Sequence, residues 1–227
     1  MLVQDLTLLV LLVLLLVLGA RDNGIDDVGF VRKIIDNLTR QLNIDRNRIY
    51  ATGMSNGGML AYRLACEMAD TFKAIASVAG TDNTASCTPQ APISVLHINA
   101  RNDDRVLYNG GAGKKFRDMS KVTDFTSVPV TISKWVKLNG CNPTPRRTLD
   151  VPGAYCDSYA QCQGHVEVQL CVTETGGHSW PGGSSARGDE HASRAISAND
   201  VMWTFFTAMP VKGVAKKHCP GPWGPAP

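Results

Sequence analysis

Two uninterrupted apolar runs, "AIASVAG" at residues 74–80 and "ISVLHINA" at 93–100, limit the possible folds of this chain most strongly. Runs of this length are typical of strands that are buried on both faces of a parallel sheet. Segments in which apolar residues recur at the spacing of a helix alternate with these runs. The pattern predicts an α/β fold with right-handed crossovers, in which helices flank a mostly parallel sheet.

The remaining elements follow from spacing and from capping residues. A strand is expected at "RIYAT", ending near Thr52, and another at residues 165–175. Helices are expected at 26–43 with Asp26 or Asp27 as N-cap, 59–68, 128–138 with Pro129 in the first turn and Trp135 on the apolar side, and 197–209 with Ser197 and Asp200 as a capping box.

Composition favours one domain and gives little support for nucleic-acid binding. The chain has 227 residues, 44% of them hydrophobic, which is enough for one sizeable core. Its formal charge of +3 is spread thinly, without basic clusters interleaved with aromatics. We assign the domain to residues 26–209 and a Pro-rich tail to 210–227.

Seven cysteines favour disulfides in an oxidising compartment, since Cys156 and Cys162 are too far apart for a CxxC motif. Six paired cysteines allow 15 connectivities, which spacing alone leaves open. We expect Cys219, in the Pro-rich tail, to be the cysteine left over.

The N-terminus carries an apolar run, "LTLLVLLVLLLVL", before Gly19 and Ala20. Its length is closer to a signal-peptide core than to a membrane span of about 20 residues. Residues 1–20 are therefore predicted to direct secretion. Because no Lys or Arg precedes the run, a single membrane anchor and an artefactual N-terminus stay open as alternatives, and membrane contact is expected only if the leader is uncleaved.

The candidate nucleophile is Ser55, in the GxSxG pattern Gly53-Met54-Ser55-Asn56-Gly57 between a predicted strand and a predicted helix. A nucleophile at such a strained turn needs nearly side-chain-free neighbours at both glycine positions. The amide of Asn56, at the start of the helix, would then point at a developing oxyanion. The alternative is an ordinary serine in a glycine loop.

A general base and an acid complete the candidate site. His178 in the Gly-rich loop "TETGGHSWPGG" can reach a serine, whereas we expect structural roles for His97, His165, His191 and His218. Asp103 and Asp104 follow a predicted strand, and either could orient the imidazole. The chain order Ser, Asp, His is that of α/β-hydrolases.

Four segments together resemble the secreted poly(3-hydroxybutyrate) depolymerase and feruloyl or acetylxylan esterase family of α/β-hydrolases. They are "DDVGFVRKIIDNL", "RIYATGMSNGGMLAYRLACE", "WVKLNGC" and "GGHSWPGG", and the match runs from about residue 26 to 208. The resemblance implies Ser55 as nucleophile, His178 as base and the Asn56 amide as oxyanion donor.

The resemblance also bears on the acid and on the acyl pocket. The family's acid lies in an HGTxDP-like segment, whose register here selects Asp103 and places Asp104 at the proline position. Ala100 and Arg101 stand where the family has Gly and Thr. Trp180 is expected either to wall the acyl pocket or simply to pack.

The resemblance further implies that the family's N-terminal third is absent, together with a loop that donates the second oxyanion N–H. A truncated gene model or a genuine short paralogue would explain this, and the strand at "RIYAT" would then have an open edge. The expected function is a secreted serine carboxylic-ester hydrolase acting on polyhydroxybutyrate-like polyester or on feruloyl or acetyl plant cell-wall esters, without metal or cofactor. The alternative is a non-catalytic remnant that binds polysaccharide or polyester at most.

Overall fold

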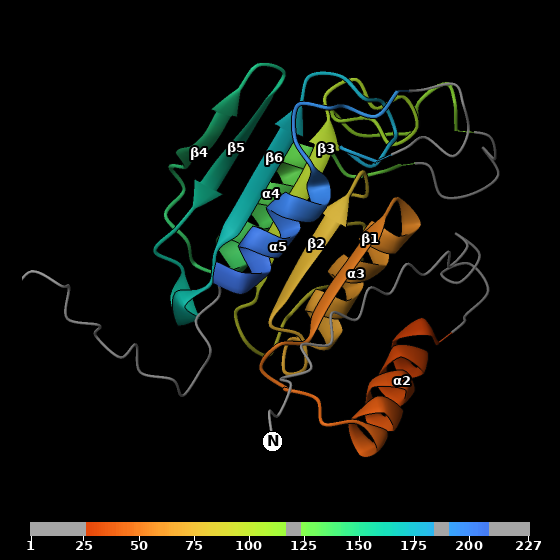
Figure 1. Ribbon diagram of the computed structural model, residues 1–227, viewed down its shortest axis with the longest axis vertical. Coiled ribbons are helices and arrows are strands. Elements are labelled where there is room, and N and C mark those ends of the chain that lie inside the picture. Colours follow the sequence, from red (N-terminus) through yellow and green to blue (C-terminus); the bar gives the residue numbers. More distant parts are fainter. Residues whose placement is uncertain (1–25, 117–123, 184–190, 209–227) are drawn as a thin grey trace, which may run out of the picture.

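The computed structural model describes residues 26–116, 124–183 and 191–208, which form one six-stranded sheet with helices on both faces (Figure 1). The strand order is β1-β2-β3-β6-β5-β4. The strands are β1 (Tyr50–Met54), β2 (Ala74–Val78), β3 (Ser94–Ala100), β4 (Arg146–Val151), β5 (Ala154–Tyr159) and β6 (Val168–Thr173). The helices are α2 (Asp27–Gln41), α3 (Asn56–Glu67), α4 (Val128–Leu138) and α5 (Ala198–Ala208), and the 3-10 turn η1 (Gln163–His165) precedes β6.

The predicted α/β class with a mostly parallel sheet is confirmed. Strands β1, β2, β3 and β6 are parallel, whereas β5 and β4 join the sheet in antiparallel fashion. Because the four parallel strands share one direction, their carboxyl ends meet at a single edge of the sheet. Among the described strands, β1 pairs only with β2, so the expected open edge is present in this part of the chain.

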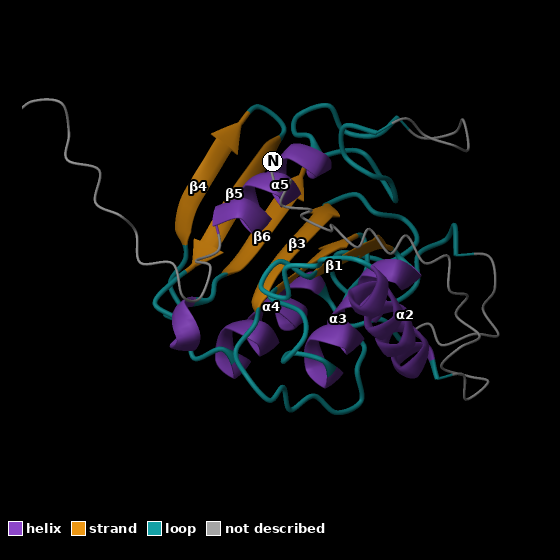
Figure 2. Cartoon of the chain, turned by 60° about the horizontal axis from the view of Figure 1, so that its bottom comes forward, coloured by secondary structure: helices purple, strands orange, loops and turns teal. Residues whose placement is uncertain are grey.

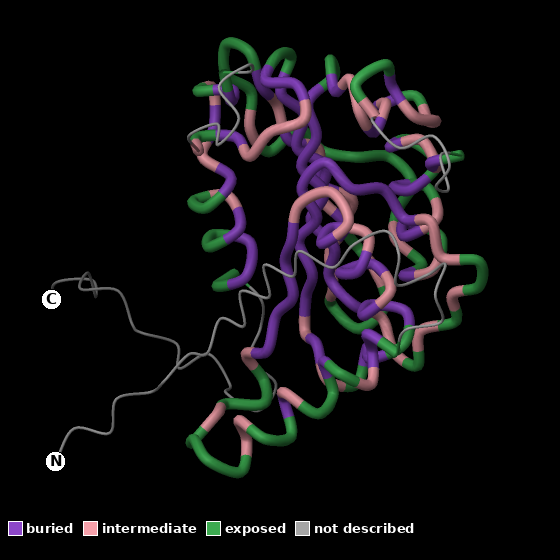
Figure 3. Tube along the Cα trace, turned by 90° about the vertical axis from the view of Figure 1, so that its right-hand side faces the viewer, coloured by how far each residue is buried: buried purple, intermediate pink, exposed green. Residues whose placement is uncertain are grey.

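Two apolar layers hold the helices to the sheet. Helices α2, α3 and α4 lie on one side of the sheet and α5 lies on the other (Figure 2). Trp135, Tyr62 and Phe72 are among the largest buried side chains of the first layer. In the second layer the ring of Tyr50 stacks on Phe206 of α5, with centroids 4.6 Å apart. The buried residues follow the strands and the inner faces of the helices (Figure 3).

The predicted helices are present, with small shifts at their ends. Asp26 is the N-cap of α2, and its carboxylate accepts from the Gly29 amide at 2.7 Å. Helix α4 has the predicted bounds, with Pro129 in its first turn and Trp135 buried. Helix α3 begins at Asn56, three residues before the predicted start, because the Gly-rich segment is already helical. Ser197 caps α5 by accepting from the Asp200 amide.

No strand is expected from the sequence between residues 141 and 164, and this expectation is wrong. This segment contains the antiparallel hairpin of β4 and β5. Strand β4 is exposed along most of its length, so it shows none of the apolar alternation by which strands are predicted. The strand predicted at residues 165–175 is shorter, from Val168 to Thr173, and His165 lies in η1 before it. Strand β6 lies inside the sheet, so most of its residues are buried.

Three disulfides connect the described cysteines. Cys66–Cys87 joins α3 to the segment after β2, Cys141–Cys162 joins the end of α4 to the end of β5, and Cys156–Cys171 links β5 to β6. The six cysteines other than Cys219 are therefore all paired with one another, which agrees with the expected leftover. Cys219 itself lies outside the described residues, as do the predicted leader 1–20 and the tail 210–227. No helix in the described ranges is long and apolar enough to span a membrane.

His97 is packed in the core, as predicted. It is fully buried in β3, and its Nδ1 lies 2.8 Å from the Tyr62 hydroxyl. Burial raises the pKa of Tyr62, so this phenol stays protonated and donates to Nδ1. Burial also lowers the pKa of His97 to about 4, although the side chain of Asn99 partly opposes the shift. His97 is therefore a neutral core residue.

We expect His97 to make the protein less stable in mild acid. The unfolded chain protonates this side chain near pH 6.5 and the folded chain only near pH 4, so its contribution to stability is complete above pH 6.5 and is lost as the pH falls toward 4. The free energy of unfolding should fall by up to about 1.4 kcal/mol per pH unit in this window. The free energy of unfolding can be measured by urea denaturation at several values between pH 7 and 4.5. It should depend less steeply on pH in His97→Gln than in the wild type, whereas the exposed control His165→Gln should keep the wild-type pH dependence. The same pH dependence in all three proteins would contradict the expectation.

Candidate active site

Ser55 forms the sharp turn between β1 and α3. Its backbone has φ 57° and ψ −120°, a conformation that residues with side chains rarely adopt. The hydroxyl makes no capping hydrogen bond to α3, and the amide donates to the carbonyl oxygen of Val78 at 2.8 Å. The strand, turn and helix predicted around the GxSxG pattern are thus confirmed.

Close backbone contacts explain why glycine surrounds this turn. A Cβ atom on Gly53 would lie 2.5 Å from the carbonyl carbon of Gly57, and one on Gly58 would lie 2.3 Å from the Ser77 hydroxyl. A Cβ on Gly80, in the segment after β2, would lie 2.3 Å from the carbonyl oxygen of Ser55. Real Cβ atoms essentially never approach other atoms this closely, so a side chain at Gly53 or Gly80 would displace the backbone of the turn, and one at Gly58 would displace the Ser77 hydroxyl.

Asp103 and His178 form a hydrogen-bonded pair. The imidazole Nδ1 lies 2.9 Å from Oδ2 and 3.1 Å from Oδ1 of the carboxylate. Oδ1 also accepts from the amides of Arg105 and Val106 at 2.9 and 3.0 Å. The Asp103 side chain is fully buried and that of His178 is 8% exposed. Since a carboxylate can only accept, Nδ1 carries the proton, which leaves Nε2 of His178 to accept one.

The geometry separates the two candidate acids. Asp104 turns its carboxylate to Lys115, 2.9 Å from the ammonium nitrogen, instead of to His178. Of the two, only Asp103 has its carboxylate against the imidazole.

The loops that carry the candidate residues lie along the carboxyl edge of the four parallel strands. Ser55 follows β1, Asp103 follows β3 and His178 follows β6. Backbone hydrogen bonds connect this edge from strand to strand: Ser55 N to Val78 O, Ala79 N to Ile98 O and Arg101 N to Thr173 O, at 2.8, 2.9 and 2.8 Å. The structure therefore joins Asp103 to His178 directly and places Ser55 at the same edge.

Asn56 and Trp180 have different surroundings. Asn56 is the first residue of α3, where an amide has no acceptor within its own helix, so its N–H is suited to an oxyanion. The indole N–H of Trp180 donates to Asn199 at 3.1 Å, and the ring packs against the apolar layer under α5. Packing thus accounts for much of the Trp180 side chain, and its role in an acyl pocket stays a prediction.

Sequence reasoning missed two residues that connect the acid loop to its neighbours. Asn102 accepts from the Gly177 amide at 3.0 Å, which ties this loop to the residue before His178. Arg101 donates to the Tyr155 hydroxyl at 2.8 Å and lies 3.6 Å from the Glu174 carboxylate. Both contacts reach residues more than 50 positions away in the sequence, so spacing offered no signal for them. They show how the loop is held although Ala100 and Arg101 replace the family's Gly and Thr.

Within the described ranges, no three His, Cys, Asp or Glu side chains are grouped in a way that could hold a metal ion. The candidate side chains that the structure brings to the carboxyl edge of the sheet are a serine, a histidine and an aspartate. These groups suit acyl transfer by a covalent route.

Comparison with known proteins shows which class of fold carries this geometry. Residues 18–128 match the model of the prolyl oligopeptidase family. The acetyl xylan esterase from Aspergillus awamori superimposes on 82% of this chain and 68% of its own, with a TM-score of 0.51 at 12% identity, a likeness that concerns the fold. The chain has an α/β-hydrolase fold.

The more specific resemblance is to esterases. The chain is 33% identical over 159 residues to feruloyl esterase B of Piromyces equi, covering 68% of this chain and 29% of that protein. It is 37% identical over 193 residues to "Probable feruloyl esterase C" of Aspergillus clavatus, covering 84% of this chain and 60% of that protein. The chain thus resembles feruloyl and acetylxylan esterases, and it spans less than two thirds of the length of these two relatives.

Proposed function

We propose that this protein hydrolyses carboxylic esters through an acyl-enzyme in which Ser55 is the nucleophile. The observation that carries the proposal is the Asp103–His178 pair, which keeps the ring proton on Nδ1 and so makes Nε2 the proton-accepting atom of the imidazole, at the sheet edge where Ser55 occupies its strained turn. Relatives whose names describe them as feruloyl esterases support the same reaction class.

The chemistry has two halves. The hydroxyl oxygen of Ser55 attacks the ester carbonyl carbon while His178 Nε2 takes the hydroxyl proton. The Asn56 amide donates to the resulting oxyanion. His178 then gives the proton to the departing alkoxide oxygen, so an alcohol leaves and the acyl group stays on Ser55. In the second half a water molecule gives its proton to His178 and attacks the acyl carbon. Ser55 recovers the proton when the acid is released.

The substrate class proposed first is the plant cell-wall ester, either feruloyl or acetyl. The names of the relatives support this class, whereas the poly(3-hydroxybutyrate) alternative rests on the sequence resemblance alone. Secretion is supported by the three disulfides, since such bonds persist in oxidising compartments. Turnover of methyl ferulate, acetylated xylan and a 3-hydroxybutyrate oligomer by the same preparation would rank the three substrate classes.

Labelling with a fluorophosphonate probe tests the proposed function most directly. An activated serine attacks the phosphorus and displaces fluoride, so we expect the wild-type protein to be labelled at Ser55, as identified by peptide mass spectrometry. The variant Ser55→Ala should take up no probe while it keeps the wild-type melting temperature. A folded wild-type protein that is neither labelled nor able to cleave p-nitrophenyl acetate would overturn the proposal and favour the non-catalytic alternative.

A further inference from the structure

We propose that Asp82 is a positioning residue for the nucleophile's turn, acting through the chain segment 78–84. This inference deepens the proposed function and rests on it for its kinetic consequence. Asp82 belongs to none of the sequence motifs, and it neither contacts His178 nor lies in the turn itself. Its effect must therefore pass through the backbone that supports Ser55.

The segment after β2 forms the support behind Ser55. Val78 accepts from the Ser55 amide through its carbonyl oxygen, and the Ala79 amide donates to Ile98 of β3. Gly80 lies so close that an added Cβ would be 2.3 Å from the Ser55 carbonyl oxygen. Ala79 has φ 49°, a left-handed conformation that non-glycine residues keep only when their surroundings enforce it. A shift of this segment would therefore displace the Ser55 backbone.

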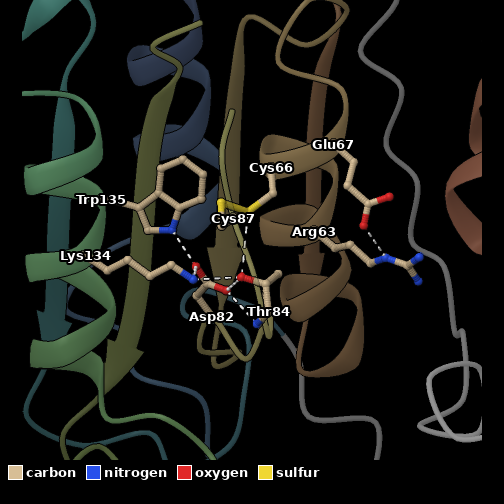
Figure 4. The surroundings of a disulfide bond; sticks show 8 residues. All are labelled: Arg63, Cys66, Glu67, Asp82, Thr84, Cys87, Lys134 and Trp135. Atoms are coloured by element: carbon tan, nitrogen blue, oxygen red, sulfur yellow. Dashed lines mark hydrogen bonds and ion pairs between the residues drawn. A yellow bond between two sulfur atoms is a disulfide. The ribbon is translucent and has the colours of Figure 1, made fainter. Parts of the chain in front are cut away.

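Asp82 attaches this segment to α4. Its carboxylate is fully buried, and Oδ2 accepts from the Trp135 indole N–H and from the Lys134 ammonium, each at 2.9 Å (Figure 4). Its amide donates to the Thr131 hydroxyl at 3.2 Å. These three partners come from successive turns of one face of α4, so a single side chain and its amide fix the segment against the helix.

The other carboxylate oxygen holds the segment's own backbone. Oδ1 accepts from the Thr84 amide at 2.9 Å and from the Thr84 hydroxyl at 2.7 Å, and that hydroxyl accepts in turn from Lys134 at 2.7 Å (Figure 4). The disulfide Cys66–Cys87 ties the chain three residues beyond this segment to α3, the helix that begins just after Ser55. The segment is thus attached to α4 directly and to α3 through the disulfide that follows it.

The energetics favour a role in geometry over one in stability. A buried ion pair often adds little net stability compared with a well-packed apolar replacement, whereas a buried carboxylate that loses its donors is strongly unfavourable. With both oxygens satisfied, Asp82 allows one arrangement of segment 78–84 relative to α4. That arrangement carries the hydrogen bond to Ser55.

The test compares Asp82→Asn with Glu67→Gln. The first variant replaces the oxygen that accepts from Trp135 and Lys134 with an amide group that can only donate. The second breaks the exposed pair of Arg63 and Glu67 on α3, 2.8 Å apart, which lies beside the disulfide (Figure 4). For p-nitrophenyl acetate, Asp82→Asn should lower kcat roughly 10- to 100-fold with little change in KM, because small displacements of a reacting group have effects of this size. Glu67→Gln should leave both constants unchanged.

Hydrogen exchange provides a readout that is independent of activity. The amides of Ser55 and Ala79, which donate to Val78 and Ile98, should exchange faster in Asp82→Asn and at the wild-type rate in Glu67→Gln. Unchanged exchange of both amides in Asp82→Asn would overturn the inference, whatever the protein's activity. Faster exchange with no hydrolysis by the wild-type protein would instead refute only the proposed function.

A second variant covers the case in which Asp82→Asn fails to fold. Lys134 is 29% exposed at its side chain, so Lys134→Met tests the same attachment from a less buried position. It should raise the exchange of the Ser55 amide and lower kcat in the same direction, and Lys134→Arg, which keeps a donor for Asp82, should restore both. If Lys134→Met leaves exchange and kcat at wild-type values, the inference is wrong.

Discussion

Ser55→Ala and His178→Ala are each expected to lower kcat/KM for p-nitrophenyl acetate by about 10⁴- to 10⁶-fold, and the double variant is expected to lose no more than either single one. The hydroxyl and the imidazole act in one proton transfer. Once the nucleophile is gone, the base has nothing to deprotonate, and without the base the hydroxyl is a poor nucleophile. The fold losses of kcat/KM in the two single variants should therefore not multiply in the double variant.

The three variants should be purified as folded proteins and assayed at high enzyme concentration, because the residual rates will be close to that of the uncatalysed reaction. His165→Ala serves as control, since His165 lies in η1 and is exposed. It should keep the wild-type kcat/KM. If the losses of Ser55→Ala and His178→Ala multiply in the double variant, the two side chains act independently, which would contradict the mechanism.

How far the sequence predicts this fold depends on where each element buries its side chains. Strands β2 and β3 are buried at every position, so the apolar runs at 74–80 and 93–100 predicted them well. Strand β4 is different because its residues are mostly exposed, and its side chains contact those of β5 instead of packing into the core. Arg147 lies 4.0 Å from the centre of the Tyr155 ring and bonds to Asp157 at 2.6 Å. Contacts of this kind leave no apolar periodicity, so the hairpin was missed.

Some residues of the candidate site can likewise be predicted from the sequence and others cannot. Ser55 and His178 stand in local patterns, a GxSxG turn and a Gly-rich loop, whose physical demands can be recognised in a few residues. Asp103 could be told from Asp104 only by the resemblance, because both follow the same strand. The support from Asp82 could not be predicted, since its partners Thr131 and Trp135 lie 49 and 53 positions away and no local pattern marks them.

Asp103→Asn is expected to lower kcat for p-nitrophenyl acetate by about 10⁴-fold while the loop keeps its fold. Oδ1 of Asp103 accepts from the amides of Arg105 and Val106, so the carboxamide oxygen of an asparagine would take that position. Its NH₂ group would then face Nδ1 of His178, where Oδ2 now accepts at 2.9 Å. Facing a donor, Nδ1 must become an acceptor. The ring proton moves to Nε2, the atom that has to take the proton of Ser55.

Asp104→Asn is the matched control, because it makes the same chemical change at the neighbouring residue. Asp104 pairs with Lys115, and both side chains are partly exposed, so losing this ion pair should change the free energy of unfolding by about 1 kcal/mol or less. Its kcat should stay within about twofold of wild type, because the Asp104 carboxylate faces Lys115 and makes no contact with His178 that the substitution would remove. The position of the ring proton in both variants can be read from imidazole ¹⁵N chemical shifts. Asp103→Asn with the proton still on Nδ1, or a larger loss of kcat in Asp104→Asn, would show that Asp103 does not set the tautomer of His178.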